Sequence, residues 1–475
     1  MRFLFLQNIW REYFGVMHVG AALRAAGHEV EVRVAPDARR ALSAVATLQP
    51  DVVGFSFTNC EQQYVLDAAA MIKRVAPHIT ILAGGAHPSL HPELARRAGI
   101  DIVCRGEGDA AIVELADRLQ RGVSYHDVRN LAFTVDGELV VNPARPLLEE
   151  LDRLPLPWRE GYYRYKFLRD NPVKFFFTSR GCPFSCNFCF NSALRELAPN
   201  RKKYVRHFSP EWVLDDLTAV RDRWPMKIVR FEDDVFTLDR DWLERLLTQY
   251  TRRIGLPYIC YVRAGIDEET IRLLAQTGCR TVLFGIETGD EKRRNGMLKK
   301  GVTNEQIVAT AALLHKHRLH FFTTNILALP HETWDDALTT LRLNQQIRVP
   351  DAWCSIFQPY AGLPLTERAV AEGLLPRVDD DTVGTNTFAA NALLNPDAER
   401  IFNLHKFFYP LARWPRLEKY LLPLTKLRPN RLFHYLWLVF YVYSYRQHTG
   451  VSWRRIAVEG MHWFRQFLST MGPQR

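Results

Sequence analysis

The sequence has no fourth cysteine near the segment where three cysteines stand together. Cys182, Cys186 and Cys189 lie within the stretch SRGCPFSCNFCF of residues 179–190, and the other five of the eight cysteines are scattered. A structural zinc site closes with four ligands, and the nearest downstream histidine, His207, lies beyond the spacing of a compact zinc finger. The missing ligand argues against structural zinc. The scattered cysteines argue against a disulfide framework, and the lack of such a framework fits a reducing cytoplasm.

The sequence also lacks a long apolar run, a secretory signal pattern and a long basic block. One apolar and aromatic run, residues 432–445, is bounded by Arg431 and Arg446 and is shorter than the ~20 residues of a bilayer span. The chain begins with residues typical of a strand rather than of a secretory signal. The net charge of +10 comes from basic residues mixed with acidic ones, which is typical of a solvated surface. We therefore expect a cytoplasmic protein that binds no nucleic acid.

Three thiols at C-x3-C-x2-C spacing can converge on one iron–sulfur cluster. Clusters of the four-iron type normally take four thiolates, so a cluster held by these three leaves one iron open to another molecule. A redox dithiol formed by Cys186 and Cys189 is the alternative, but it leaves Cys182 without a role. The segment therefore predicts an enzyme with an open iron–sulfur cluster. The remaining cysteines are expected to be small buried hydrophobes: Cys60, Cys104, Cys260, Cys279 and Cys354.

This segment resembles the signature of the radical S-adenosylmethionine (SAM) superfamily, C-x3-C-x-aromatic-C, with Phe188 as the aromatic residue. The resemblance implies a [4Fe-4S] cluster held by Cys182, Cys186 and Cys189, with SAM chelated to the open iron and Phe188 beside these cofactors. It also implies that an external electron donor such as flavodoxin or ferredoxin reduces the cluster, which then cleaves SAM to a 5′-deoxyadenosyl radical.

Residues 1–142 alternate short apolar runs with amphipathic helical patterns, which is typical of a parallel α/β sheet. The sequence predicts a Rossmann-like, doubly wound domain, and ligands of such sheets bind beyond the carboxyl ends of the strands. The dipeptide Asp136-Gly137 predicts a hairpin over 131–141 at the end of this domain. The expected parallel strands are 3–6, 30–34, 51–57, 79–83 and 101–104.

Small and polar residues follow these strands, with GFSFT at 54–58, AGGAHP at 83–88 and RGEG at 105–108. Glycine there permits close approach of the backbone to a ligand, although each glycine could equally mark a tight turn. Together with the cysteine motif, the pattern resembles the cobalamin-binding domain that precedes the radical SAM core in a large subgroup. The resemblance places these residues at the cobalamin: Ser56, Thr58, Gly84, Gly85, Glu107 and Gly108.

The domain lacks the Asp-x-His-x-x-Gly motif with which many cobalamin domains supply a histidine ligand to cobalt. The nearest match, VMHVG at 16–20, has neither the aspartate nor the glycine spacing, and His18 falls within a helical pattern. We expect His18 to be structural, and the resemblance then implies cobalamin with no protein imidazole on cobalt. Weakly ligated cobalt would favour methyl transfer out of methylcobalamin.

A linker over 143–170, punctuated by prolines, is expected to be extended and to lead into a second α/β series over 171–375. The alternating strands and helices predict a partial (β/α)6 barrel, which by resemblance is the radical SAM core. The cysteine segment follows the first strand, and active sites in barrels lie at the carboxyl ends of the strands. The expected strands are 174–178, 228–232, 258–263, 281–286, 321–327 and 353–358.

Polar residues at three strand ends match positions at which the family meets SAM. Asp233 is expected to meet the SAM amino group through a charge-assisted hydrogen bond, whereas Glu232 beside it is expected at a helix N-terminus. Arg263 could pair with the SAM carboxylate or with a surface acid. Glu287, between two glycines, matches the position that reaches the SAM ribose or amino group.

Two later strand ends complete the predicted site. The fifth strand ends with Ala328 and His331 where the family usually has glycines, and His331 puts the local backbone shape in question. After the sixth strand, QPYAG at 358–362 resembles the Pro-Tyr-x-Gly turn of the cobalamin subgroup. Tyr360 is the candidate catalytic residue, as a proton donor or as part of the substrate site, with a buried packing tyrosine as the alternative.

Residues 376–475 are rich in aromatic and basic residues and carry no family motif. They predict a helical region that closes the barrel mouth and shapes the pocket of a small-molecule substrate, and the aromatic content favours a hydrophobic one. Basic-aromatic helices also suit a membrane surface, so peripheral membrane contact stays open as an alternative.

These features together predict a cobalamin-dependent radical SAM enzyme. Methyl transfer to an unactivated carbon is the favoured reaction, in which one SAM methylates cobalamin and a second supplies the radical. Oxidative cyclisation, as in relatives of the anaerobic protoporphyrin monomethyl ester cyclase, or rearrangement is the alternative. A cobalamin-sensing binding protein with a vestigial barrel is a third hypothesis, against which the three cysteines and Glu287 argue.

Overall fold

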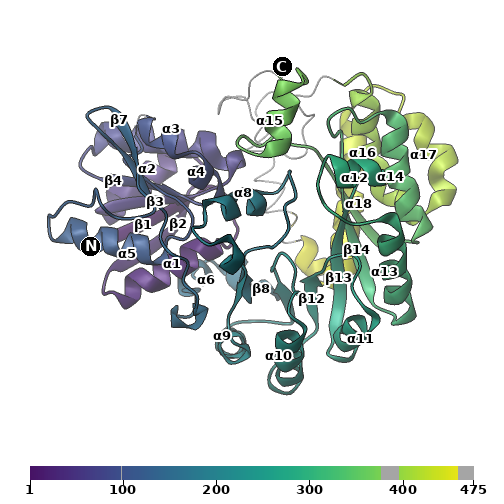
Figure 1. Cartoon of the computed structure of the whole chain (residues 1–475), viewed down its shortest axis with the longest axis horizontal. Coiled ribbons are helices and arrows are strands. Elements are labelled where there is room, and N and C mark those ends of the chain that lie inside the picture. Colours follow the sequence, from purple (N-terminus) through teal and green to yellow (C-terminus); the bar gives the residue numbers. More distant parts are fainter. Residues whose placement is uncertain (98, 376–394, 458–459, 461–475) are drawn as a thin grey trace.

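Two α/β units lie side by side in the computed structural model, which describes residues 1–97, 99–375, 395–457 and 460 (Figure 1). The N-terminal unit is built on a seven-stranded sheet with the order β2-β1-β3-β4-β5-β6-β7. Strands β1 to β5 are parallel, and β6 and β7 form the predicted hairpin, in which Asp136 and Gly137 have φ values of 51° and 83°. The strands are β1 Arg2–Gln7, β2 Glu29–Val34, β3 Val52–Ser56, β4 Thr80–Gly84, β5 Ile102–Cys104, β6 Leu131–Val135 and β7 Glu138–Val141.

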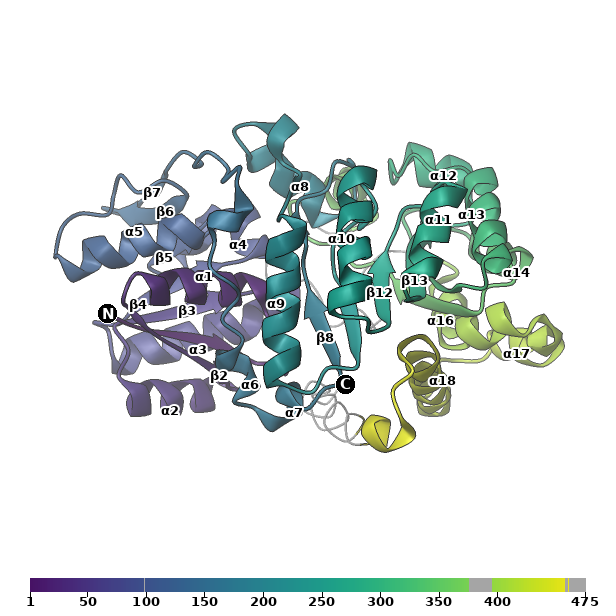
Figure 2. The same ribbon diagram turned by 90° about the horizontal axis from the view of Figure 1, so that it is seen from below.

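Helices cover both faces of this sheet, as the doubly wound prediction requires (Figure 2). Alternate residues of a strand point to opposite faces, so Phe3 and Phe5 pack in the cluster that includes α1 and α5, whereas Leu4 and Leu6 pack in the cluster that includes α2 and α3. The prediction of a Rossmann-like domain with five parallel strands is confirmed. The helices are α1 Phe14–Ala25, α2 Ala38–Leu48, α3 Gln62–Val75, α4 Ala86–Leu90 and α5 Asp109–Gln120.

The second unit is a partial barrel of six parallel strands with the sequential order β15-β14-β13-β12-β11-β8. This confirms the predicted (β/α)6 arrangement. The strands are β8 Val173–Phe176, β11 Ile228–Phe231, β12 Tyr258–Tyr261, β13 Cys279–Glu287, β14 His320–Leu327 and β15 Asp351–Ile356.

The outer helices of the barrel begin at polar residues that accept a hydrogen bond from a backbone N–H of the first turn. These caps fix where the outer helices begin. The caps are Ser209, Asp239, Asp267, Asp290, Thr303 and Thr333. The helices they open are α9 Pro210–Arg223, α10 Arg240–Arg253, α11 Glu268–Gln276, α12 Glu291–Gly296, α13 Asn304–Lys316 and α14 Trp334–Gln346, and α15 Pro364–Ala371 follows them.

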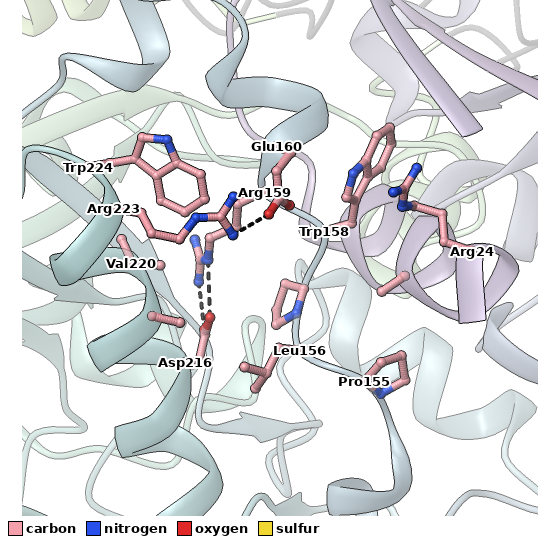
Figure 3. A pocket seen from close by; sticks show the side chains of 13 residues that line it. Arg24, Pro155, Leu156, Trp158, Arg159, Glu160, Asp216, Val220, Arg223 and Trp224 are labelled. Atoms are coloured by element: carbon pink, nitrogen blue, oxygen red, sulfur yellow. Dashed lines mark hydrogen bonds and ion pairs between the residues drawn. The ribbon is translucent and has the colours of Figure 1, made fainter. Parts of the chain in front are cut away.

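The linker is packed and partly helical, contrary to the prediction of an extended segment. Its last proline is Pro157, and the helices α6 Glu160–Tyr163 and α7 Lys166–Arg169 follow, where no proline opposes them. Arg159 is 2 % exposed and donates two hydrogen bonds to Asp216 of α9, at 3.2 and 2.7 Å (Figure 3). A buried cation is costly unless it is paired, so this ion pair fixes the linker against the barrel.

The predicted C-terminal helical region lies partly outside the described residues. The described part forms α16 Ala398–Arg413, α17 Glu418–Leu424 and α18 Arg431–Thr449. α18 packs at the amino ends of the barrel strands, because Thr281 donates to the carbonyl of His448 (2.9 Å) and Ser444 donates to Asp351 (2.5 Å).

The floor of the barrel, at the end opposite the mouth, is apolar and needs a cover. Val451 and Ile456 supply it by packing against the first residues of the strands, among them Val173 and Ile228. Helix α18 and the residues after it therefore close the floor of the barrel and not its mouth, and for this part of the C-terminal region the prediction is wrong.

Candidate active site

The three cysteines lie in a loop beyond the carboxyl end of β8. The loop runs from β9 Ser179–Arg180 to α8 Phe190–Leu197, and β9 pairs with β10 Arg206–His207 in a short antiparallel ribbon that the sequence did not indicate. Gly181, directly before Cys182, has a φ of +89°, and a Cβ there would lie 2.4 Å from the carbonyl oxygen of Tyr204. Only glycine fits this position, so the backbone fixes where the cysteine loop begins.

The thiols of Cys182, Cys186 and Cys189 are all half-buried. Burial raises the pKa of Cys182 to about 11 and the pKa of Cys189 to about 12, and nearby Cys186 contributes to both shifts. Among the described residues, no three His, Cys, Asp or Glu side chains lie close enough together to hold a single metal ion. A four-iron cluster, however, takes one thiolate per iron. Three neighbouring thiols on one loop are therefore a donor set that fits a [4Fe-4S] cluster with an open iron.

The cysteine loop is held against the barrel by Asn187 and Phe188. The backbone N–H of Asn187 donates to the carbonyl of Leu298 and its side chain to that of Met297, each at 3.0 Å. Phe188 packs beside the same two residues in an apolar cluster. Phe188 thus anchors the loop, and its place beside the cofactors stays a prediction.

Arg263, two residues after the end of β12, reaches the cysteine loop. Its guanidinium carbon lies 3.7 Å from the ring centroid of Phe184, a residue between Cys182 and Cys186. Stacking of this kind is a cation–π contact, and it holds a positive charge next to the thiols. This position suits the predicted pairing with the SAM carboxylate, which stays a prediction.

Asp233 follows β11 and is 1 % exposed. Its Oδ1 accepts hydrogen bonds from the Thr178 N–H (2.9 Å), the Thr178 hydroxyl (3.0 Å) and the Ser179 hydroxyl (2.5 Å). Burial raises the pKa of Asp233 to about 6, against the opposing effect of these hydrogen bonds. Asp233 therefore fastens the start of the cysteine segment to β11. Its Oδ2 has no hydrogen-bond partner among the described residues, so one oxygen is left for the predicted SAM contact.

Glu232 is not at a helix N-terminus, and that prediction is wrong. α10 begins eight residues later, at Arg240, and Glu232, directly after the end of β11, instead forms an ion pair with Arg230 on that strand. Arg230 also donates to the hydroxyl of Tyr261 on β12 at 2.6 Å. Residues two apart on a strand face the same side, so this pair forms a polar patch on one face of the sheet, next to the half-buried ring of Phe175.

Glu287, the last residue of β13, forms an ion pair with Lys300 (2.5 Å) and is 7 % exposed. Its φ of 66° lies in the left-handed region. A Cβ at Gly285 would lie 2.0 Å from Glu287 Oε1 and 2.5 Å from Lys300 Nζ. Gly285 therefore makes room for this ion pair, and the partner Lys300 was missed because it comes thirteen residues later in the sequence. The contact of Glu287 with SAM stays a prediction.

Ala328 and His331 take the backbone conformation that glycines usually take. Their φ values are 58° and 55°, in the left-handed region that non-glycine residues rarely adopt. The loop after β14 thus keeps the expected shape in spite of the two side chains. His331 is held by a hydrogen bond between its Nε2 and a carboxylate oxygen of Glu372, at 2.7 Å.

The residues predicted to meet cobalamin lie at the carboxyl ends of β3 and β4, where Ser56 pairs in register with Gly84. Gly85 has a φ of +99°, and a Cβ there would lie 2.8 Å from the backbone nitrogen and oxygen of Phe57. His87, in the first turn of α4, is fully buried, and neither of its ring nitrogens has a hydrogen-bond partner among the described residues. Small residues at the sheet edge and an unsatisfied buried imidazole fit a ligand at this edge.

Thr58, Glu107 and Gly108 have protein partners of their own. The backbone N–H and hydroxyl of Thr58 both donate to Glu61, at 2.9 and 2.7 Å. Glu107 forms ion pairs with Arg206 and Arg180 of the barrel unit. Gly108 precedes α5. Glu107 thus joins the two units, a role that the sequence did not indicate, and the cobalamin contacts of all three residues stay predictions.

Tyr360 lies where the two units meet. Its hydroxyl is 4.0 Å from Cys60 Sγ in the loop after β3, and its ring centroid is 5.2 Å from that of Phe190, directly after Cys189. Cys60 is half-buried rather than buried, so the prediction of a small core residue is wrong for this cysteine. Its place just past a strand end was the signal that could have marked it.

His18 is a buried structural residue, as predicted. It lies in α1 and is 7 % exposed, and its ring stacks on Phe208 and Trp212 of the barrel unit. Burial lowers the pKa of His18 to about 3, so the imidazole is neutral. A separate cavity of about 240 Å³ lies at the linker (Figure 3), and none of the predicted cofactor residues lines it.

Two family models match the chain, one on each unit. The B12 binding domain matches residues 12–116, and the radical SAM superfamily matches residues 176–343. The chain is a cobalamin-binding member of the radical SAM superfamily. This membership makes it an enzyme whose cofactors are a [4Fe-4S] cluster, SAM and cobalamin, and the donor sets described above fit them.

The names of the relatives of this radical SAM enzyme refer to different reactions. An uncharacterised methyltransferase of Pyrococcus horikoshii is 29 % identical over 336 residues, which cover 70 % of this chain and 72 % of that protein. The anaerobic magnesium-protoporphyrin IX monomethyl ester cyclase of Rubrivivax gelatinosus is 24 % identical over 333 residues, which cover 66 % of this chain and 58 % of that one. The match thus spans less than two thirds of the cyclase.

Among solved structures, the cobalamin-dependent SAM radical enzyme OxsB, with aqua-cobalamin and SAM bound, superimposes with a TM-score of 0.68. The superposition covers 99 % of this chain and 75 % of OxsB at 14 % identity. At this identity the likeness establishes the shared fold.

Proposed function

We propose that this radical SAM enzyme transfers a methyl group from SAM, by way of cobalamin, to an unactivated carbon of a small molecule. The observation that carries the proposal is the meeting of three loops at Tyr360. The loop after β3 on the cobalamin side, the start of α8 on the cluster side and the loop after β15 are in contact there. Bringing reactive groups together is the main contribution that a protein makes to such a reaction.

The bound cofactors would supply the radical and methyl-transfer chemistry, and the chain would hold them. Cys182, Cys186 and Cys189 would ligate the cluster, and an external electron donor would reduce it. Burial, with the nearby Cys60 adding to it, raises the pKa of Tyr360 above its usual range, so its hydroxyl stays protonated and can donate a hydrogen bond or a proton to substrate. The residues proposed for SAM are Phe188, Asp233, Arg263 and Glu287, and those for cobalamin are Ser56, Thr58, Gly84, Gly85, Glu107 and Gly108.

The side chains on the inner face of the barrel sheet favour a largely apolar substrate with one polar group. Phe175, Tyr261 and Trp353 are half-buried aromatic residues that pack with the apolar floor of the barrel. The ion pair of Arg230 and Glu232 adds a polar patch beside them. Binding sites of small molecules are typically apolar with few polar groups that fix orientation.

Oxidative cyclisation is the second candidate function, favoured by the likeness to the Rubrivivax cyclase. The two are separated by incubating anaerobic, cluster- and cobalamin-loaded enzyme with methyl-labelled SAM and a chemical reductant, and by quantifying the products by mass spectrometry. Methyl transfer predicts S-adenosylhomocysteine and label on cobalamin, together with 5′-deoxyadenosine. 5′-Deoxyadenosine alone would move the assignment to cyclisation or rearrangement.

A matched pair of cysteine variants tests whether the cluster is responsible. Cys182→Ala should abolish 5′-deoxyadenosine formation, because only two thiolates remain. Cys279→Ala, at the first residue of β13 and far along the strand from the cysteine loop, should leave it unchanged. If both variants or neither lose the product, the assignment of the cluster to Cys182, Cys186 and Cys189 is wrong.

A further inference from the structure

The outer side of α18 is apolar although it faces solvent. Leu432, Tyr435 and Val439 are 63 %, 55 % and 64 % exposed, and their spacing of three and four residues places them on one side of the helix. No charged residue occurs in α18 between Arg431 and Arg446. A surface helix normally carries charged and polar residues on its outer face. Within the part of the chain that the structure describes, the exposed side of α18 therefore has no apolar partner.

The buried side of the same helix already has its partners. Phe433 and Trp437 are 5 % and 7 % exposed; Phe433 packs on Phe407 of α16 and Trp437 on Trp353 of β15. Packing within the chain thus explains one side of α18 and leaves the other unexplained.

The segment that leads into α18 is strongly basic. Lys426, Arg428 and Arg431 are exposed, and Leu427 among them is 53 % exposed. Residues 413–446 contain seven lysines and arginines and one acidic residue. That acid, Glu418, is paired with Arg342. The apolar side of α18 is therefore bordered by positive charge that lacks nearby negative charge in the sequence.

We propose that residues 426–439, the docking segment, bind the surface of an anionic lipid bilayer. The apolar side chains would enter the boundary between headgroups and acyl chains, and the cations would contact anionic headgroups. Among the described residues no helix is long and apolar enough to cross a bilayer, so the contact would be with one leaflet. Figure 2 shows α17 and α18 on the barrel side of the molecule, away from the N-terminal sheet.

A second copy of the chain fits this surface less well than a bilayer does. A twofold interface places the same patch on both partners, so Lys426, Arg428 and Arg431 would face their own copies. Like charges brought together in this way oppose association, whereas an anionic bilayer is complementary to them.

The test is sedimentation of the full-length, cofactor-loaded enzyme with vesicles of phosphatidylcholine and phosphatidylglycerol. Wild type should bind these vesicles, bind pure phosphatidylcholine more weakly, and lose binding as salt rises. The double variant Leu432→Glu, Val439→Glu should bind at least about tenfold more weakly, and so should Lys426→Glu, Arg428→Glu. Because all four side chains are exposed, the variants should fold and keep their cofactors.

Matched controls lie on the N-terminal unit. Val75 on α3 is 62 % exposed, and Arg39 and Arg74 are exposed cations. Val75→Glu and the pair Arg39→Glu, Arg74→Glu should leave vesicle binding unchanged. The proposal is overturned if wild type does not bind anionic vesicles, or if the controls weaken binding as much as the docking-segment variants do. It is also overturned if Leu432→Glu abolishes a dimer seen in sedimentation equilibrium. Formation of 5′-deoxyadenosine in solution should be the same in all these variants. A failure of wild type to bind vesicles would therefore count against the docking segment alone, and a failure to form 5′-deoxyadenosine against the proposed function alone.

Discussion

Glu332 is a carboxyl group buried without a cation bonded to it. It is 2 % exposed, and its carboxyl group accepts hydrogen bonds from backbone N–H groups of the preceding loop, among them that of Leu329 at 3.2 Å. Burial raises the pKa of Glu332 to about 8 from 4.5. The folded state therefore holds this proton more tightly than the unfolded state. The contribution of Glu332 to stability is full below about pH 4.5 and is lost as the pH rises toward about 8.

Glu332→Gln should remove this pH dependence, because the amide keeps the shape and cannot ionise. We expect the variant to gain ~2–3 kcal/mol in free energy of unfolding relative to wild type between pH 6 and pH 9. Urea unfolding at the two pH values measures the gain, and other titrating groups cancel in the difference. Glu305→Gln, at an exposed position on α13, is the control and should change little. An equal response of the two variants would contradict the raised pKa.

At the residue scale, the sequence predicted which polar residues lie at strand ends. It did not predict their hydrogen-bond and ion-pair partners. The sequence placed Asp233 and Glu287 at strand ends because the apolar runs ended there. It could not show that Asp233 is occupied by Thr178 and Ser179 or Glu287 by Lys300. These partners come from other strands and loops, and no local pattern encodes which of several polar residues will meet.

Among the elements, the loop after β4 depends on one glycine. At Gly85 the backbone has φ +99° and ψ −170°, a region that is essentially restricted to glycine. Gly85→Ala should lower the free energy of unfolding by ~2–4 kcal/mol and weaken cobalamin binding, since the loop must move away from Phe57. Urea unfolding and spectroscopic titration with cobalamin measure the two effects.

Gly27 is the matched control for Gly85. It has a φ of +87° but nothing within 4 Å of a Cβ, so Gly27→Ala keeps the backbone strain without the steric clash. It should cost ~1 kcal/mol and leave cobalamin affinity unchanged. Equal effects of the two substitutions would show that φ, and not close packing against Phe57, sets the requirement at position 85.

The strands and helices that the sequence predicted were strands with long apolar runs and helices with a capping residue. All eleven expected parallel strands are present, because alternation and length identify a buried strand. The ribbon of β9 and β10 has two residues on each strand and is too short to leave a pattern. The helices α6 and α7 of the linker are four residues each. They follow Arg159, which holds the linker against the barrel through Asp216, 57 residues later in the sequence.

At the scale of the whole molecule, the ion pair of Arg180 with Asp109 joins the cobalamin-binding unit to the start of the cysteine loop, beside the pairs that Glu107 makes. Arg180 of β9 donates two hydrogen bonds to Asp109, the first residue of α5, at 2.7 and 3.2 Å. Burial alone would raise the pKa of Asp109, but the charge and hydrogen bonds of Arg180 outweigh burial and hold that pKa below its usual range. The side chains of Arg180 and Asp109 are 18 % and 11 % exposed, so solvent screens the pair little.

A double-mutant cycle on this pair measures how strongly the two units are coupled. Asp109→Asn should cost ~2–3 kcal/mol in free energy of unfolding, because it leaves the largely buried Arg180 charge with its longer contact to Glu107, at 3.5 Å, in place of the closer pair. Adding Arg180→Gln should recover part of that loss, with a coupling energy of ~2 kcal/mol. The exposed pair Arg40 and Asp37, 3.6 Å apart and 69 % and 53 % exposed, should show a coupling below ~0.5 kcal/mol. If Asp109 and Arg180 were additive, this ion pair would not couple the cobalamin-binding unit to the start of the cysteine loop. The ion pairs of Glu107 with Arg206 and Arg180, and the stacking of His18 on the barrel unit, would then hold the two units together.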